Sequence, residues 1–197
     1  RDTNGDGKMD VTEKFGSVST TGIKLRDGYL YYATPVTVER IKLAPGELKP
    51  AAAPEVVVSD LPGTGAHRDK GLAFDGKGSL YVNVGAPSNA CQTPDRRAKV
   101  PGQDPCQLLE QHGGIWKFDE NKLGQKQADG TRYATGLRQM LAVAWHDGAF
   151  YTVMNNRDQI DTLWPDAFVA KDNETRPAEV MYRVDQAGDN FGWPYCF

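Results

Sequence analysis

The stretch that decides the fold is Gly71-Leu-Ala-Phe-Asp-Gly-Lys-Gly-Ser-Leu-Tyr81. It combines an apolar strand, a turn built on Asp-Gly, and a second strand that contains Leu-Tyr. The same order of features occurs at residues 22–31 and 141–151, each time with Asp-Gly at the turn. Asp-Gly between alternating apolar residues is a strong signal for a β-hairpin. The sequence therefore predicts three copies of one hairpin unit, and such repetition is typical of repeat architectures.

Further strands are predicted between these hairpins, at residues 36–43, 55–59, 114–118 and 179–184. About four short strands per unit are typical of the blades of a β-propeller. We therefore expect an all-β fold in which residues 1–197 form one partial propeller domain of about three blades. The chain begins at Arg1 without an initiator methionine, which also indicates a fragment. A β-sandwich has evenly spaced short strands as well and is the alternative.

Composition and charge argue against two classes of partner. The net charge of the 197 residues is −3, and no run of Lys and Arg interleaved with aromatic residues occurs, so no nucleic-acid surface is expected. No apolar run approaches the ~18 residues that a membrane span needs, so no membrane-spanning segment is expected.

Two of the three cysteines flank a loop rich in Pro, Gly, Arg and Gln. No CxxC motif or nearby His pair indicates zinc, so Cys91 and Cys106 are predicted to form a disulfide. Free buried thiols are the alternative. With the disulfide formed, Cys196 is the odd cysteine, and a partner for it would lie beyond residue 197. A disulfide would place the protein in the periplasm or outside the cell.

Residues 2–13, Asp-Thr-Asn-Gly-Asp-Gly-Lys-Met-Asp-Val-Thr-Glu, fit the twelve-residue calcium loop. Gly7 stands at the position of the turn glycine. The ligand positions are occupied by Asp2, Asn4, Asp6, Lys8 through its carbonyl, Asp10 and Glu13. The flanking sequence does not predict the helices of an EF-hand, so the metal would be structural. An acidic hairpin turn built on Asn-Gly and Asp-Gly is the alternative.

Three polar loops at the edges of the repeats could carry chemistry. His67 follows a Gly-rich stretch and could act as a general base near neutral pH. Arg138 directly precedes an apolar strand, and its planar guanidinium suits a carboxylate partner. Asn155, Asn156 and Arg157 follow another strand and offer oxygen atoms suitable for a hard cation. For each loop an ordinary solvated turn is the alternative.

Together these motifs resemble the glucose/sorbosone dehydrogenase family of soluble sugar dehydrogenases that use pyrroloquinoline quinone (PQQ). The segment from His67 to Ser88-Asn89 resembles the family's catalytic-histidine blade. Gly136-Leu-Arg-Gln139 is similar to the family's Gly-Leu-Arg-Asn, and Asn155-Asn-Arg-Asp158 to its Asn-Glu-Arg-Asp. Gly188-Asp-Asn-Phe-Gly-Trp-Pro-Tyr195 is similar to the family's (Asn/Phe)-Tyr-Gly-Trp-Pro-Tyr. The four motifs also occur in the same order as in the family.

The resemblance implies a six-bladed propeller that oxidises an aldose or sugar aldehyde and passes the electrons to an external acceptor. His67 would take the proton of the substrate hydroxyl while hydride passes to the C5 carbonyl of PQQ. Arg138 would lie beside the quinone with Gln139 as its neighbour in that contact. Calcium, bound partly by backbone carbonyls near Asn156 and Arg157, would polarise the quinone. The cofactor-contacting set would be Arg138, Gln139, Asn155, Asn156 and Arg157.

The chain departs from the family pattern at three positions. Gln139 replaces an Asn, Asn156 replaces a Glu, and Ala66 stands where the glucose enzymes carry an acid before the histidine. The alternatives are a calcium-dependent propeller hydrolase or lactonase and a non-catalytic propeller that binds carbohydrate or protein. We expect the 197-residue chain by itself to be inactive, because half a ring cannot enclose a cofactor.

Overall fold

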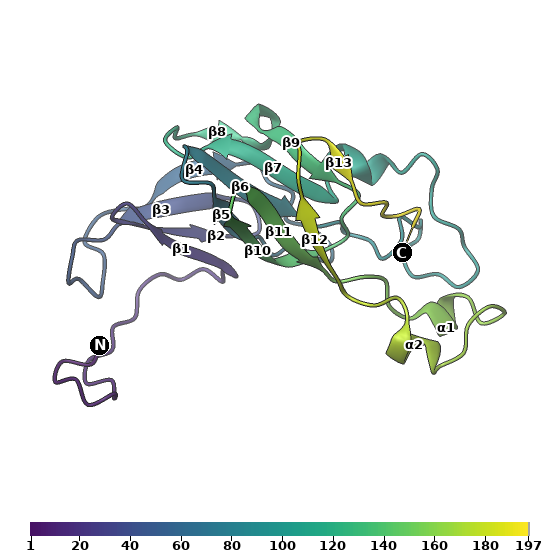
Figure 1. Cartoon of the computed structure of the whole chain (residues 1–197), viewed down its shortest axis with the longest axis horizontal. Helices are drawn as coiled ribbons and strands as arrows, with labels where there is room; N and C mark the ends of the chain where they lie inside the picture. The colour runs from purple at the N-terminus through teal and green to yellow at the C-terminus, as the bar shows by residue number, and fades with distance from the viewer. Residues whose placement is uncertain (197) are drawn as a thin grey trace.

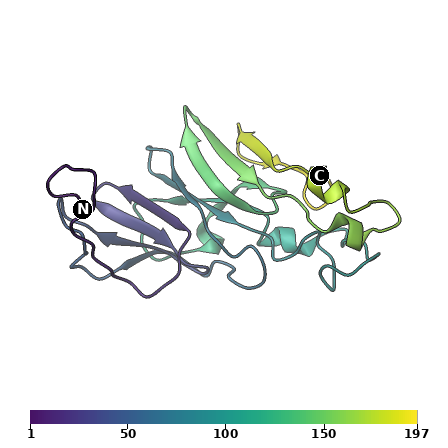
Figure 2. The same cartoon turned by 90° about the horizontal axis from the view of Figure 1, so that it is seen from below.

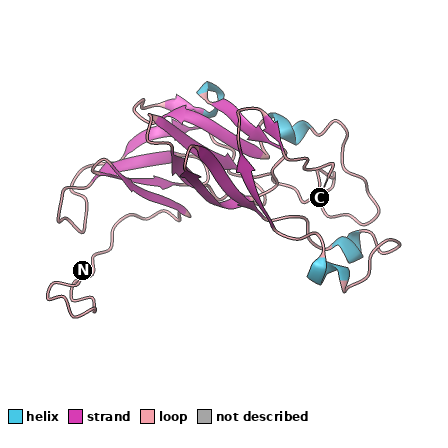
Figure 3. Ribbon diagram, viewed as in Figure 1, coloured by secondary structure: helices cyan, strands magenta, loops and turns pink. Residues whose placement is uncertain are grey.

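The computed structural model describes residues 1–196; Phe197, the last residue of the predicted domain, lies outside the described residues. Three β-sheets form the body, and only short helices accompany them (Figure 3). The expectation of an all-β fold is thus confirmed. None of the helices in residues 1–196 has the length and apolar character to cross a bilayer.

The first sheet has the order β1-β2-β3-β4-β8 and lies toward the N-terminal end of the molecule (Figure 1). Its strands are β1 (Gly22–Arg26), β2 (Tyr29–Ala33), β3 (Val38–Lys42), β4 (Glu55–Ser59) and β8 (Gln125–Lys126).

The second sheet has the order β13-β9-β7-β6-β5, and the third has the order β10-β11-β12. The strands of the second sheet are β5 (Leu72–Phe74), β6 (Ser79–Val84), β7 (Gly114–Asp119), β9 (Thr131–Thr135) and β13 (Asp189–Asn190). The strands of the third sheet are β10 (Met140–His146), β11 (Ala149–Met154) and β12 (Val180–Val184). The helices are α1 (Ile160–Leu163), α2 (Asp172–Thr175) and two 3-10 turns, Gln107–Glu110 and Gln127–Asp129.

All three predicted hairpins form, as β1–β2, β5–β6 and β10–β11. Two have tight two-residue turns, Asp27-Gly28 and Asp147-Gly148, in which both residues have positive φ. This is the type I′ geometry that favours Asp-Gly. The middle hairpin has a longer turn, in which the carboxylate of Asp75 accepts hydrogen bonds from two backbone amides of the turn.

The second sheet is buried on both faces. Strand β6 is buried at all six positions, and its alternating residues serve two cores. Leu80 and Val82 pack with residues of the first sheet, such as Val38, whereas Tyr81 packs with Phe150 of the third sheet. The second sheet therefore lies between the other two, as Figure 2 also shows.

The four further strands that the sequence predicts are present as β3, β4, β7 and β12, with β4 at the predicted bounds. The disulfide between Cys91 and Cys106 is also confirmed, and Cys196 is a free, exposed cysteine. The sequence did not predict the five-residue strand β9, nor the two-residue strands β8 and β13, which pair in parallel with β4 and β9. Two residues are too few to show a strand period, and these strands exist because distant segments pair with them.

Candidate active site

The three predicted polar loops meet at one end of the sheets. In an antiparallel hairpin, the start of the first strand lies opposite the end of the second. The loops that precede β5 and β10 therefore lie at the same end as those that follow β6 and β11. Two backbone hydrogen bonds of 2.8 Å join these loops, from Ala86 N to Arg138 O and from Asn155 N to Gln139 O.

A pocket of about 470 Å³ opens where the loops meet. The predicted cofactor and catalytic residues all line it, namely His67, Arg138, Gln139, Asn155, Asn156 and Arg157. Carboxylates that the predictions did not include line it too, among them Asp69, Asp158 and Glu179.

His67 is held by a backbone carbonyl. Its backbone is left-handed, with φ of 58°, and its Nδ1 lies 2.6 Å from the carbonyl oxygen of Ala86. A carbonyl only accepts, so Nδ1 carries the proton in this contact, and Nε2 is left as the basic nitrogen. Burial lowers the pKa of His67, and the positive charge of Arg138 lowers this pKa further. The ring is therefore neutral at neutral pH, the state that a general base needs.

The Ala86 carbonyl gives the His67 ring an orienting contact although no acid stands at position 66. In the expected family pattern a carboxylate precedes the histidine, and Ala66 cannot replace it. The carbonyl fixes the tautomer of the ring without adding a negative charge to the site.

Arg138 is almost completely buried, with 2% exposure. Its Nε donates to the carbonyl of Asn89 at 3.2 Å, and its Nη1 donates to the carbonyl of Asn155 at 3.1 Å. Its Nη2 makes no hydrogen bond to any residue from 1 to 196 and lies 3.5 Å from a carboxylate oxygen of Asp158. The guanidinium is thus fixed in place, with its Nη2 buried beside the carboxylate of Asp158.

Asn89 connects the parts of the site. Its carboxamide Nδ2 donates to the carbonyl of Asp158 at 2.9 Å, and its Oδ1 accepts from the amide of Asp158 at 3.3 Å. Its own carbonyl accepts from Arg138 and also from the indole Nε1 of Trp193, at 2.9 Å. In the sequence, Asn89 and Trp193 stand out only as parts of motifs. That the Asn89 carbonyl binds both Arg138 and Trp193 is seen only in the folded structure.

Asp158 is coupled to the disulfide-bonded loop. Arg96, from this loop, makes a bidentate contact with the Asp158 carboxylate and also donates to Gln159. Burial raises the pKa of Asp158, but the hydrogen bond from Arg96 and the charge of Arg138 outweigh this effect and hold the pKa below its usual value. Asp158 is therefore an anion between two arginines, a feature that no local sequence signal shows.

Gln139 has 4% exposure, and its Oε1 is buried with no hydrogen-bond partner among residues 1–196. The side chain fits because residue 85 is a glycine. A Cβ atom on Gly85 would lie 2.2 Å from Oε1 of Gln139 and 2.5 Å from the carbonyl oxygen of His67. Gly85 therefore makes room for both site residues at once.

The loop after β11 is held mainly through Asn156, whose side chain is turned toward the protein. Its Nδ2 donates to the carbonyl of Ala178 at 3.3 Å, and its Oδ1 accepts from the amide of Arg157 at 2.9 Å. The Asn156 amide donates to the carboxylate of Glu179 at 2.9 Å. The side chain of Asn156 thus shapes the loop, and the loop brings Asn155 and Arg157 to the pocket.

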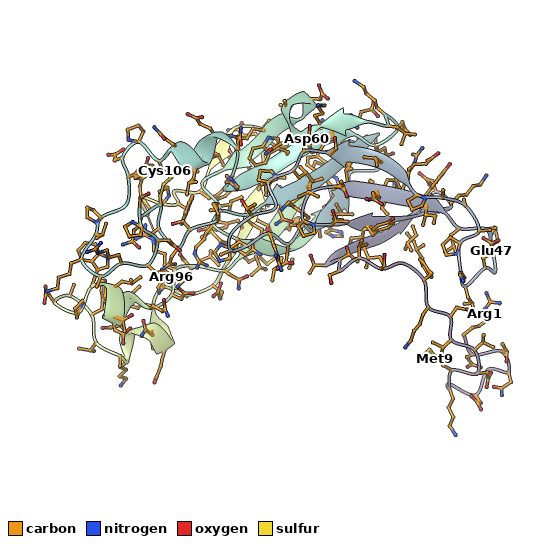
Figure 4. All side chains as sticks on the ribbon, turned by 180° about the vertical axis from the view of Figure 1, so that it is seen from behind. Arg1, Met9, Glu47, Asp60, Arg96 and Cys106 are labelled. Carbon is orange, nitrogen blue, oxygen red and sulfur yellow. A yellow bond between two sulfur atoms is a disulfide. The ribbon has the colours of Figure 1, made fainter. Side chains whose placement is uncertain are left out.

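The predicted calcium loop lies at the opposite end of the molecule. Figure 4 shows Arg1 and Met9 far from Arg96, which marks the site. Asp2 accepts backbone hydrogen bonds from Asn4, Gly5 and Gly7, and the same pattern continues along the loop. Hydrogen bonds from Gly7 and Gly5 lower the pKa of Asp2. Glu13, the predicted bidentate ligand, makes no hydrogen bond or ion pair with any residue described in the structure.

The donors and acceptors of the pocket fit a quinone cofactor. Arg138 and Gln139 both line the pocket, and their side chains carry an unused donor, Nη2, and an unused acceptor, Oε1. Both atoms are buried, so these side chains would have to turn toward the pocket to contact a carbonyl oxygen or an N–H group of the cofactor. No group of three or more His, Cys, Asp or Glu side chains within residues 1–196 is arranged to bind a metal. A calcium ion at this site would therefore need backbone and amide oxygens as well as carboxylates.

A protein-family model described as TrAA12-like matches residues 2–197 of the chain. No curated protein matches the chain.

Several solved structures have a similar fold. The calcium structure of a Trichoderma reesei enzyme of Carbohydrate-Active Enzymes family AA12 superposes with a TM-score of 0.66 at 17% identity, over 88% of this chain and 43% of that one. The holo form of a pyranose dehydrogenase PQQ domain from Coprinopsis cinerea gives 0.56 at 17% identity, over 70% and 33%. The PQQ-bound aldose sugar dehydrogenase from Streptomyces coelicolor gives 0.52 at 17% identity, over 86% and 44%. The chain thus spans less than half the length of each of these structures.

Proposed function

This chain belongs to the TrAA12-like family, and from this premise we propose that it forms part of a PQQ-dependent dehydrogenase that oxidises an aldose or a sugar aldehyde. The observation that carries the proposal is the pocket in which a neutral histidine and a fixed arginine meet beside an unpartnered glutamine oxygen. The PQQ-containing structures of similar fold support the same reading. The narrower assignment to the glucose/sorbosone dehydrogenase family is part of this proposal.

In the proposed reaction, Nε2 of His67 takes the proton of the substrate hydroxyl. The Ala86 carbonyl keeps the ring oriented throughout, and the buried Arg138 stabilises negative charge that develops beside it. PQQ, held by Arg138, Gln139 and the loop from Asn155 to Arg157, would supply the hydride acceptor. An external electron acceptor would then complete the cycle.

Calcium has two proposed places. The first is the pocket, where oxygens near Asn156 and Arg157 would hold it against the quinone. The second is the loop of residues 2–13, which is remote from the pocket, so calcium there would only stabilise that loop.

The three sheets are proposed to be neighbouring blades of a larger propeller. Large apolar side chains are exposed on the outer sheets: Ile23 and Leu25 on β1 are 56% and 72% exposed, and Met181 on β12 is 67% exposed. Further blades would cover these side chains. The disulfide supports an oxidising compartment, either the periplasm or the outside of the cell.

The test is dye reduction by the full-length protein with PQQ, calcium and a panel of aldoses and sugar aldehydes. Turnover should require PQQ and fall by about 100-fold or more in His67→Ala, the range expected for loss of a general base. His146→Ala, at an exposed hairpin turn, is the matched control and should keep full activity. If the protein neither binds PQQ nor turns over any sugar, the proposal is wrong.

A further inference from the structure

Lys70 is a buried cation without a carboxylate on its ammonium group. Its exposure is 1%, although lysines are rarely buried unless they are paired. Its Nζ donates to the carbonyls of Pro62 and Arg68, at 3.0 and 2.6 Å, and makes no ion pair within residues 1–196. A methionine would fill similar space without charge, so the ammonium needs an explanation other than packing.

These two hydrogen bonds close the loop that carries His67. Pro62 lies at the start of the loop, and Arg68 is the residue directly after His67. The main chain beside Lys70 is held by two side chains: the Thr21 hydroxyl donates to the Lys70 carbonyl at 3.5 Å, and Oδ1 of Asn83 accepts from the amide of Gly71. The ammonium therefore ties a strained residue, with φ of 58° at His67, to a rigid anchor at the start of β5.

The neighbouring segments on both sides hold the same loop. Asn83 of β6 donates to the carbonyl of Asp69 at 3.1 Å, and a Cβ atom on Gly65 would meet the Pro87 side chain at 2.8 Å. Lys70 thus joins two points of its own loop, Pro62 and Arg68, whereas Asn83 contacts this loop from a neighbouring strand.

We propose that Lys70 is a positioning residue for the proton-transfer step, because its charge-assisted hydrogen bonds hold the His67 loop in its working conformation. This inference rests on the proposed function. The charged and titratable groups around the ammonium are Asp69 and Arg68 of its own loop and His112 of the neighbouring segment. Residues 19–21 and 33–35, which share a small cavity with Lys70, contribute no charged group.

Deprotonation of Lys70 weakens this clamp. Burial lowers the pKa of Lys70 to about 8, against a smaller opposing effect of Asp69. A neutral amine still donates hydrogen bonds, but these bonds are about half as strong as those from an ammonium group. The surroundings of the His67 ring should therefore change twice with pH: once when His67 itself titrates, and again at higher pH when Lys70 loses its proton.

The test is an NMR titration of the His67 C2–H signal in the full-length protein without cofactor. The wild type and Lys77→Met, which changes an exposed lysine in the next turn, should titrate below the ordinary value of 6.5. In Lys70→Met the midpoint should move up toward 6.5, because a released loop exposes the ring, and Lys70→Arg should restore it in part. A His67 titration in Lys70→Met that equals the wild type would overturn the proposal.

Two further readouts keep the inference testable. The wild-type signal should show a second shift with a midpoint near pH 8, and a signal that stays constant through the alkaline range would contradict the proposal even if Lys70→Met fails to fold. In the loaded enzyme, Lys70→Met should lower kcat by ~10–100-fold, as expected for a misplaced base, with the Kd for PQQ unchanged. If no sugar is oxidised at all, the proposed function fails, while the titration still decides the role of Lys70.

Discussion

Replacing Asn89 by alanine tests whether the site is organised around this residue. The variant removes two hydrogen bonds, of 2.9 and 3.3 Å, to the carbonyl and the amide of Asp158. Asn89 itself has 1% exposure, but Asp158 is partly accessible, so water can replace some of the loss. At about 1 to 1.5 kcal/mol for each bond, the free energy of unfolding should fall by about 2 to 3 kcal/mol.

The assay is urea unfolding followed by circular dichroism. With an m-value of about 2 kcal/mol/M, the expected loss lowers the unfolding midpoint by about 1 M or slightly more. Asn121→Ala, at an exposed turn, is the control and should leave the midpoint unchanged. A midpoint for Asn89→Ala equal to that of the control would refute the reasoning, because it would mean that the two bonds contribute nothing to the folded state.

Three other changes probe the site and the fold. Gly85→Ala should abolish PQQ binding measured by quinone absorbance, because the added methyl would lie 2.2 Å from Oε1 of Gln139; unchanged binding would show that Gln139 does not contact the cofactor. Activity plotted against pH should fall on the acid side with a midpoint below pH 6.5, because the pKa of His67 is lowered. In Arg138→Gln the NMR midpoint of His67 should move to higher pH, since this change removes a charge that lowers the histidine pKa; a shift to lower pH would contradict this. A thiol assay on the 197-residue chain should find one reactive thiol, Cys196, before reduction and three after it; three thiols before reduction would exclude the bond. Removal of the disulfide should lower the free energy of unfolding by about 3 kcal/mol.

The hairpins could be predicted from sequence because their determinants are local. Asp27-Gly28 and Asp147-Gly148 adopt positive φ values that few other residue pairs tolerate, and alternating apolar residues follow at once. Strands β8 and β13 could not be predicted, since their two residues pair only because distant segments come together. The apolar residues of β6 indicate that this strand is buried on both faces. The sequence does not indicate which residues of the first and third sheets pack on each face.

For the site, residue types and their order predicted which side chains line the pocket, but not what holds them. The contacts of Asn89 span 69 residues to Asp158 and 104 residues to Trp193. Arg96 reaches Asp158 across 62 residues, from a loop that reads as a polar insert. Such contacts depend on the whole arrangement of sheets, and a single sequence carries no signal for them.

The alanine at position 66 is compatible with the proposed chemistry. A carboxylate beside His67 would fix the tautomer and raise the histidine pKa, so that the ring would be partly protonated at neutral pH. The Ala86 carbonyl provides the same orientation at 2.6 Å without a full negative charge, and Arg138 lowers the pKa further. His67 is therefore a weaker base whose ring is neutral at neutral pH. Such a base depends on precise placement more than on basicity, which is why the buried contacts of Arg138, Gly85 and Lys70 around it matter for the proposed reaction.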